Sequence, residues 1–233
     1  MHFLAPHVHF TYLADMQINV QYIFWDWNGT LLDDAEICMH TMNSMLQKRQ
    51  MPLLHLEYYK SIFGFPVIDY YQKIGFDFKI ESFEDLSVEF IEMYNNELEF
   101  APLIEGAKEV LHHFKNTEHK NIIISAMKQD MLLKSVRDKK VEDYFSDILG
   151  ISNIYADSKS KIALDFVQKN LINKNDIVLI GDTAHDYEVA EAIGCRCILI
   201  ADGHQSEERL KETGAEVIST LSNLLTTIVP KSS

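Results

Sequence analysis

The sequence predicts an α/β protein with a doubly wound parallel sheet and an inserted α-helical segment. Short runs of β-branched and aliphatic residues recur along the chain and alternate with stretches of helical periodicity. Such alternation favours βαβ units, in which helices cover both faces of a parallel sheet. Two of the runs end directly in acidic clusters, and one stretch of about 67 residues contains no convincing strand.

Five runs are predicted as strands and five further stretches as helices of the sheet domain. The strands are Val20 to Trp25, Asn121 to Ser125, Ile177 to Ile180, Arg196 to Ile200 and, with a weaker pattern, Asp147 to Ile151. The helices are Glu105 to Lys115, Gln129 to Asp138, Lys161 to Asn170, Tyr187 to Ile193 and Glu207 to Thr213.

Residues 34–100 read as a helical insert, which we treat as a cap domain. Apolar residues recur there at helical spacing, as at Phe83, Leu86, Phe90 and Met93. Most of its many aromatic residues are expected to form the core of the insert. Phe63 and Phe65 are the best candidates for side chains that face a crevice and select a substrate, because Gly64 and Pro66 favour a loop there.

The remaining segments assemble into one core domain, residues 17–33 and 101–233, with Pro102 marking the return from the cap. Residues 1–16 are treated as an N-terminal extension of unknown role, with Met16 as an alternative start. They lack a basic region followed by a clean apolar stretch, so they do not resemble a signal peptide.

The composition disfavours several classes of function and of binding partner. The formal net charge of −14 disfavours nucleic acid and anionic membranes as partners, and no apolar run is long enough to span a bilayer. The three cysteines, Cys38, Cys195 and Cys197, form no disulfide framework and no zinc signature. We therefore expect a cytoplasmic protein, either a monomer or a homodimer.

The residues that carry chemistry follow two predicted strands. Asp26 comes directly after the run that ends at Trp25, and Asp182 and Asp186 come after the run that ends at Ile180. Open α/β sheets bind ligands at the carboxyl ends of their strands. Two strands that both end in aspartates therefore suggest a shared site for a divalent cation, and carboxylate oxygens suit Mg²⁺.

Four motifs occur in order between about residues 21 and 205. They are Asp26-x-Asn28-Gly29-Thr30-Leu31, the strand that ends in Ser125-Ala126, the lysine pair Lys159 and Lys161, and Gly181-Asp182-x-x-x-Asp186. With these motifs the sequence resembles the haloacid dehalogenase superfamily and, within it, the phosphoglycolate-phosphatase-like hydrolases. The resemblance implies a Rossmann-like core with a helical cap.

The resemblance also implies the roles of individual residues. Asp26 would be the nucleophile that forms an aspartyl phosphate. Mg²⁺ would be held by Asp26, the main-chain carbonyl of Asn28 and Asp182, with Asp186 bound directly or through water. Ser125, the Ala126 N–H and Lys159 would bind the phosphate, within a substrate site that also includes Gly29 and Thr30. The implied substrate is a small phosphorylated metabolite, with phosphoglycolate as the family default.

Several of these residues have simpler interpretations. Ser125 could cap the helix that follows it. Lys161 competes with Lys159 for the phosphate, although Lys159 fits better if Ser160 caps the helix and leaves Lys159 in the preceding loop. His185 and His204 are expected to be ordinary loop histidines near the crevice.

Asn28 departs from the family pattern, in which this position is normally a second aspartate that serves as general acid and base. An amide cannot donate and recover a proton near neutral pH, and such catalysis is typically worth about 10²- to 10⁴-fold in rate. Three explanations stay open: another group such as His185 supplies the proton, the substrate has a good leaving group, or the protein is a weak phosphatase or a regulatory binder of phosphate ligands. A dehalogenase or phosphonate-cleaving relative would need a cap lysine, for which Lys60 and Lys73 are nominal candidates.

Overall fold

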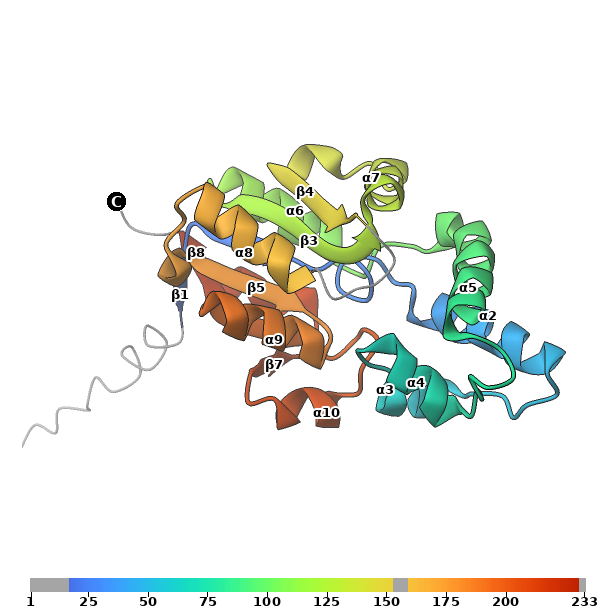
Figure 1. The fold of residues 1–233 in the computed structure, drawn as a ribbon. Helices are drawn as coiled ribbons and strands as arrows, with labels where there is room; N and C mark the ends of the chain where they lie inside the picture. Colours follow the sequence, from blue (N-terminus) through green and yellow to red (C-terminus); the bar gives the residue numbers. More distant parts are fainter. Residues whose placement is uncertain (1–16, 153–158, 231–233) are drawn as a thin grey trace, which may run out of the picture.

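A six-stranded parallel sheet forms the middle of the molecule, with the strand order β4-β3-β2-β5-β6-β7 (Figure 1). The computed structural model describes residues 17–152 and 159–230, so the N-terminal extension lies outside the described residues. The predicted parallel sheet is confirmed. Its strands are β2 (Tyr22–Trp25), β3 (Lys120–Lys128), β4 (Asp147–Ile151), β5 (Ile177–Gly181), β6 (Arg196–Ile200) and β7 (Glu216–Ile218).

Helices cover both faces of this sheet, because both faces of its central strands are apolar. Ile23 and Trp25 pack into one hydrophobic cluster, with α6 (Ala107–Asn116) and α7 (Gln129–Asp138). Phe24, which points the other way, packs into a second cluster with α8 (Lys159–Lys169) and α9 (Ala184–Ile193). The doubly wound arrangement predicted from the sequence is thus present.

A second, two-stranded sheet pairs the two ends of the described chain. Strand β1 (Ile18–Val20) lies parallel to β8 (Ile228–Pro230), and Ile18 is opposite Ile228. The sequence prediction missed both strands and also β7. The remaining short elements are α10 (Glu207–Glu212), α11 (Leu224–Thr227) and the 3₁₀ turns η2 (Glu142–Tyr144), η3 (Lys174–Asp176) and η4 (Leu221–Asn223).

Four helices with a hydrophobic cluster of their own lie beside the sheet domain, at the right of Figure 1. They are α2 (Ala35–Lys48), α3 (Leu56–Ile62), α4 (Val67–Ile74) and α5 (Phe83–Glu97), and the 3₁₀ turn η1 (Leu98–Phe100) follows them. Met42, Met45 and Leu46 of α2 are fully buried in this cluster, together with Leu86 of α5. We call this segment the cap.

The chain enters and leaves the cap through two segments that lie side by side. The Asp33 N–H donates to the Pro102 carbonyl at 2.9 Å, and Leu32 forms an antiparallel bridge with Leu103. Helix α2 begins at Ala35, with Asp34 as its N-terminal flanking residue. We call residues 32–34 and 102–103 the hinge.

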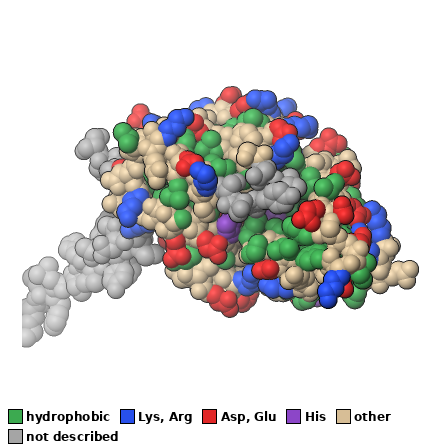
Figure 2. Space-filling model, viewed as in Figure 1, with side chains coloured by type: hydrophobic (Ala, Val, Ile, Leu, Met, Phe, Trp, Pro, Cys, Tyr) green, Lys and Arg blue, Asp and Glu red, His purple; other side chains and the backbone are tan. Residues whose placement is uncertain are grey.

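Charged residues of both signs are interspersed on the face of the molecule drawn in Figure 2, and Lys and Arg do not gather there into one basic patch. Within residues 17–152 and 159–230, no helix has both the length and the apolar character that crossing a bilayer requires.

Candidate active site

The loop that follows β2 brings Asp26 to the carboxyl edge of the sheet. The Asp26 N–H donates to the Ile180 carbonyl at 2.9 Å, which extends the pairing with β5 by one residue. Gly29 then adopts a φ of +73°, and a Cβ atom at this position would run into the side chains of Asp182 and His204. A glycine is therefore required for the loop to pass this close to the second acidic motif.

Asp182 follows β5 and is completely buried beside this loop. The Thr30 hydroxyl donates to its Oδ1 at 2.7 Å, and the main-chain N–H of His204 donates to its Oδ2 at 2.7 Å. The first and fourth sequence motifs therefore meet in space, as their positions at the ends of neighbouring strands predicted.

Lys159 is buried between two carboxylates of this site. Its Nζ lies 2.8 Å from Asp26 Oδ1 and 2.5 Å from Asp186 Oδ1. The competing Lys161 is exposed and pairs with Asp165 at 2.8 Å. The expectation that Lys159 lies in a loop before the helix is wrong, because α8 already includes it.

Asp186 has partners on both of its oxygens. Its Oδ1 faces Lys159, and its Oδ2 accepts hydrogen bonds from the Thr183 N–H at 3.0 Å and the Thr183 hydroxyl at 2.6 Å. Burial raises the pKa of this carboxyl, but the charge of Lys159 and the hydrogen bonds from Lys159 and Thr183 together outweigh burial and lower the pKa overall. Asp186 therefore closes the capping box of α9 and orients Lys159.

The electrostatics of the site suit a divalent cation. Burial raises the pKa of Asp26 to about 7 despite Lys159, and it raises the pKa of Asp182 to about 6 despite His204. One oxygen each from Asp26, Asp182 and Asp186 lies within 4.8 Å of the others. When ionised, these three carboxylates face one ammonium group, so two negative charges remain for a dication. Oxygen-only donors of this kind fit Mg²⁺.

Ser125 and Ala126 lie at the same sheet edge as Asp26, since Trp25 is opposite Ile123 on the neighbouring strand. The expectation that the strand ends at Ser125 is wrong, because β3 continues to Lys128 through a shift of register after Ile124. The Ser125 hydroxyl accepts from the Met127 N–H at 3.1 Å and stabilises this irregularity. Ser125 does not cap α7, whose N-terminal flanking residue is Lys128.

Asn28 is held with its amide group turned toward the hinge. The Asn28 Nδ2 donates to Asp34 Oδ2 at 2.9 Å and to the Tyr94 hydroxyl at 2.8 Å. The Tyr94 hydroxyl in turn donates to Asp34 Oδ2 at 2.6 Å. The Asn28 amide nitrogen therefore contacts two acceptors that belong to the protein rather than to a substrate.

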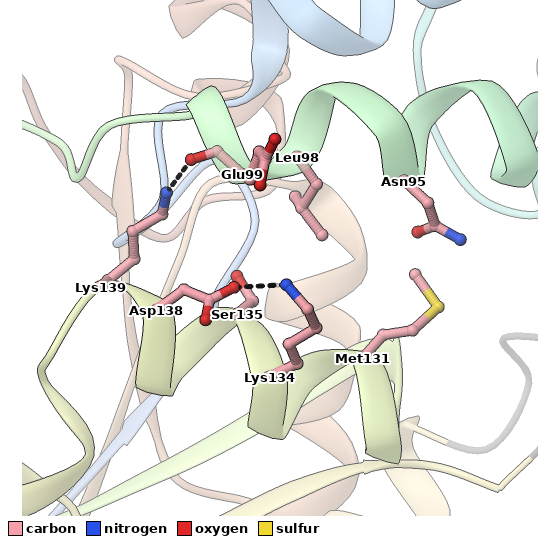
Figure 3. Close-up of a pocket in the computed structure, with 8 residues that line it drawn as sticks. All are labelled: Asn95, Leu98, Glu99, Met131, Lys134, Ser135, Asp138 and Lys139. Atoms are coloured by element: carbon pink, nitrogen blue, oxygen red, sulfur yellow. Dashed lines mark hydrogen bonds and ion pairs between the residues drawn. The ribbon is translucent and has the colours of Figure 1, made fainter.

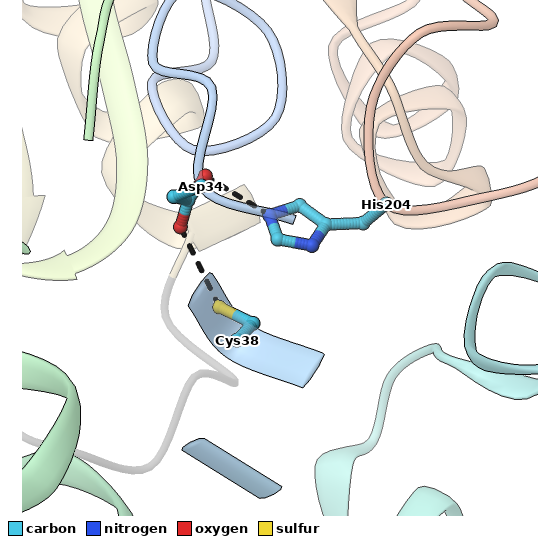
Figure 4. Close-up of side chains that lie close together, drawn as sticks. All are labelled: Asp34, Cys38 and His204. Atoms are coloured by element: carbon cyan, nitrogen blue, oxygen red, sulfur yellow. Dashed lines mark hydrogen bonds and ion pairs between the residues drawn. The ribbon is translucent and has the colours of Figure 1, made fainter. Parts of the chain in front are cut away.

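His204 is the site residue that the sequence interpretation missed. It lies in the loop after β6, but it is 4% exposed rather than an ordinary loop histidine. Its Nε2 is 3.2 Å from Asp34 Oδ1 (Figure 4), and its Nδ1 is 2.7 Å from the Tyr59 hydroxyl. Burial lowers its pKa, but the charge and hydrogen bond of Asp34, together with the charges of Asp182 and Asp26, outweigh burial and raise the pKa to about 9. In the sequence, its position after a predicted sheet strand, near the expected crevice, was the one feature that could have indicated His204 as a site residue.

His185, which we also expected in a loop, lies in the first turn of α9. Its Nδ1 is 2.9 Å from Glu188 Oε2, and its Nε2 is buried without a partner among the described residues. Its ring lies 4.8 Å from that of Phe65, so this histidine contacts the cap.

The cap loop with Phe63 and Phe65 contacts the core beside the carboxylates. The Phe63 ring is 5.0 Å from that of His204, and its carbonyl accepts hydrogen bonds from Gln205 at 3.0 Å and from Arg209. Both phenylalanines are half-buried. The loop therefore fastens the cap to the segment that follows β6.

The nominal cap lysines are poorly suited to covalent chemistry. Lys60 Nζ lies 3.3 Å from the Asp202 carbonyl, and Lys73 is exposed. A separate hollow of about 260 Å³ lies between α5–η1 and α7, where Lys139 contacts the Glu99 carbonyl (Figure 3). None of the carboxylates described above lines this hollow.

Comparisons with known proteins agree with this architecture. A family model of haloacid dehalogenase-like hydrolases matches residues 23–200. Comparison with curated proteins gives no match.

Solved structures share the fold at low identity. A haloacid dehalogenase-like hydrolase from Streptococcus pneumoniae is 17% identical, with a TM-score of 0.76 over 88% of this chain and 97% of the other. A predicted phosphoglycolate phosphatase from Haemophilus somnus is 16% identical, with a TM-score of 0.74 over 88% and 96%. A hydrolase of the same family from Deinococcus radiodurans, with bound phosphate and sodium, is 18% identical, with a TM-score of 0.69 over 89% and 94%. The chain belongs to the haloacid dehalogenase-like hydrolase family.

Proposed function

We propose that the protein is a Mg²⁺-dependent hydrolase of a small phosphomonoester. One observation carries this proposal: buried Asp26 is paired with Lys159 at 2.8 Å and lies in one cluster with Asp182 and Asp186. A buried carboxylate that is held by an ammonium group, next to an oxygen-only cation site, suits attack on an anionic phosphate. We further propose a cytoplasmic location, a monomeric or homodimeric state, and no nucleic-acid or membrane partner, from the composition alone.

In this mechanism Asp26 attacks phosphorus, the bond from phosphorus to the leaving oxygen breaks, and an aspartyl phosphate forms. Water then attacks that phosphorus, which releases inorganic phosphate and regenerates Asp26. Lys159 stabilises the negative charge on the phosphoryl oxygens, with Ser125 and the Ala126 N–H as further phosphate contacts. Bound Mg²⁺, for which Asp26, Asp182 and the Asn28 carbonyl are the proposed ligands, would neutralise phosphoryl charge.

Protonation of the leaving group is the step for which this site is least suited. The Asn28 amide nitrogen already donates to Asp34 and Tyr94, and an amide cannot give a proton to a departing oxygen near neutral pH. Substrates whose leaving group needs no proton, such as aryl or acyl phosphates, should therefore react best. Phosphoglycolate, after which one structural neighbour is named, would be a slow substrate unless another group supplies the proton.

The test is a panel of phosphate esters with Mg²⁺, using Asp26→Asn as the blank. An aryl phosphate with an acidic phenol should be hydrolysed about 10²- to 10⁴-fold faster than an alkyl phosphate, which is the usual contribution of general acid catalysis. Equal rates would show that another group donates the proton. Activity that persists in Asp26→Asn or without Mg²⁺ would overturn the proposed mechanism.

A binding protein without turnover is the second candidate, and the engaged amide of Asn28 favours it. Such a protein would bind Mg²⁺ and inorganic phosphate, yet hydrolyse no member of the panel. Isothermal titration with a trigonal metallofluoride separates the two candidates: Mg²⁺-dependent binding of this mimic of the transferring phosphoryl group would favour the hydrolase.

A further inference from the structure

A second cluster of potential metal ligands lies next to the proposed Mg²⁺ site but contains different donor atoms. Asp34, Cys38 and His204 each offer one ligand atom, and these three atoms lie within 4.8 Å of one another. Figure 4 shows Asp34 between the Cys38 thiol and the His204 ring, with contacts to both. A thiol, an imidazole and a carboxylate together are a donor set that suits Zn²⁺ rather than Mg²⁺.

We propose that Asp34, Cys38 and His204 form a Zn²⁺ site that is distinct from the carboxylate site at Asp26. Zinc sites with three protein ligands complete their tetrahedron with a water or another oxygen. Neither the composition nor the family assignment points to this site, since Cys38 occurs in no cysteine or histidine motif of the sequence.

The ligand atoms already lie close to one another. His204 Nε2 lies 3.2 Å from Asp34 Oδ1, and Cys38 Sγ lies 3.5 Å from the other carboxylate oxygen, Asp34 Oδ2. In a tetrahedral zinc site, N and O ligands lie about 3.3 Å apart, and S and O ligands about 3.5 Å apart. Each contact thus has the required length, and the Asp34 carboxylate would have to turn so that one oxygen serves both.

The groups that usually orient zinc ligands are present as well. A metal-bound histidine commonly uses its second ring nitrogen for a hydrogen bond, and His204 Nδ1 is 2.7 Å from the Tyr59 hydroxyl. Ligand carboxylates are similarly held by neighbouring donors. Asp34 accepts from the Gly29 N–H at 2.9 Å and from the Tyr94 hydroxyl at 2.6 Å.

The charges of the ligands suit a dication. Zinc binds the deprotonated thiolate and the neutral imidazole. With the Asp34 carboxylate these ligands carry two negative charges, which one dication balances, so the buried site would hold no uncompensated charge.

The site would connect the two parts of the protein. Cys38 lies on α2 of the cap, Asp34 lies at the hinge, and His204 lies in the core loop after β6. A bound ion would therefore fasten the cap to the core. It would do so close to the Asp182 carboxylate, which accepts a hydrogen bond from the His204 N–H.

The test uses Co²⁺ as a spectroscopic substitute for Zn²⁺ on the full chain, freed of metal and then saturated with Mg²⁺. One equivalent of Co²⁺ should produce the near-ultraviolet absorption of a cobalt–thiolate bond, and Zn²⁺ should abolish it. Cys38→Ser should remove the band, while Cys195→Ser and Cys197→Ser, changed at the other half-buried cysteines, should retain it. Tyr59→Phe should weaken Co²⁺ binding about 10- to 100-fold, because Tyr59 only orients His204.

Absence of the band in the unmodified protein would overturn the proposal, as would its persistence in Cys38→Ser. His204→Gln provides a second check that leaves the thiol in place: it should abolish binding of one equivalent, and unchanged binding would exclude His204 as a ligand. Circular dichroism of each variant separates loss of the site from loss of the fold. Because the readout is a metal–thiolate bond, the outcome is independent of whether the protein hydrolyses phosphate esters.

Discussion

The buried ion pair between His204 and Asp34 makes the stability of the protein depend on pH in a defined window. The pKa of His204 rises from its usual 6.5 to about 9 in the folded state, where burial opposes the shift and Asp34 drives it. A histidine whose pKa is raised by folding stabilises fully below its unfolded pKa, and this stabilisation disappears as the pH rises through the folded pKa.

The size of the effect follows from these two values. Proton linkage gives a contribution of about 3 kcal/mol at low pH, of which about 2 kcal/mol should be lost between about pH 6.5 and about pH 8.5. Asp26 adds to this loss of stability, because burial raises its pKa to about 7. A carboxyl group whose pKa is raised by folding destabilises the folded state as the pH increases. About 1 kcal/mol of this destabilisation falls between about pH 6.5 and about pH 8.5.

Urea unfolding, followed by tryptophan fluorescence in the presence of a chelator, measures these changes. The free energy of unfolding should fall by about 3 kcal/mol across the window in the unmodified protein, but by only about 1 kcal/mol in His204→Gln, since Asp26 still titrates there. His40→Gln, at an exposed histidine, is the matched control and should keep the full slope. Equal slopes in His204→Gln and the unmodified protein would refute the reasoning.

Four further substitutions probe the site. Gly29→Ala should lower the free energy of unfolding by at least about 1 kcal/mol, because φ is +73° and the new Cβ meets Asp182; unchanged stability in urea would contradict this. Lys159→Met should destabilise the protein by about 3–5 kcal/mol at neutral pH, because two buried carboxylates lose their cation, and a Tm equal to that of the unmodified protein would count against it. Asn28→Asp places a carboxylate next to Asp34, where the amide now donates a hydrogen bond at 2.9 Å, so the two negative charges should repel each other. Adding Asp34→Asn should relieve this repulsion, so the double variant should be at least about 1 kcal/mol more stable than the sum of the two single destabilisations predicts. A double-mutant cycle without coupling would disprove the contact.

The sequence predicted those parts of the fold that local patterns encode. The runs at 147–151 and 196–200 match β4 and β6, because β-branched residues fill a strand that is bounded by polar segments. Strands β1, β7 and β8 escaped prediction since each has three residues, too few for a period to emerge. Ser125 was expected at the end of a strand, but the irregularity in β3 depends on its pairing with β4, which no local pattern records.

The residues of the candidate site also differ in whether a local pattern could predict them. Asp26 and Asp182 could be predicted because each follows an apolar strand directly. The pairing of Asp34 with His204 could not, since the two residues come from opposite sides of the cap insertion and meet only in the folded chain. The amide of Asn28 shows the same limit: the substitution is visible in the sequence, whereas the residues that engage its protons are not.

The hydrogen-bonded hinge has a consequence for how such proteins diversify. Since the outgoing and returning segments already contact each other at Asp33 and Pro102, the two ends of the inserted segment lie side by side. The closure entropy of a loop depends only weakly on its length. Evolution, or a protein engineer, can therefore lengthen, shorten or exchange the inserted helices without disturbing the order of the sheet.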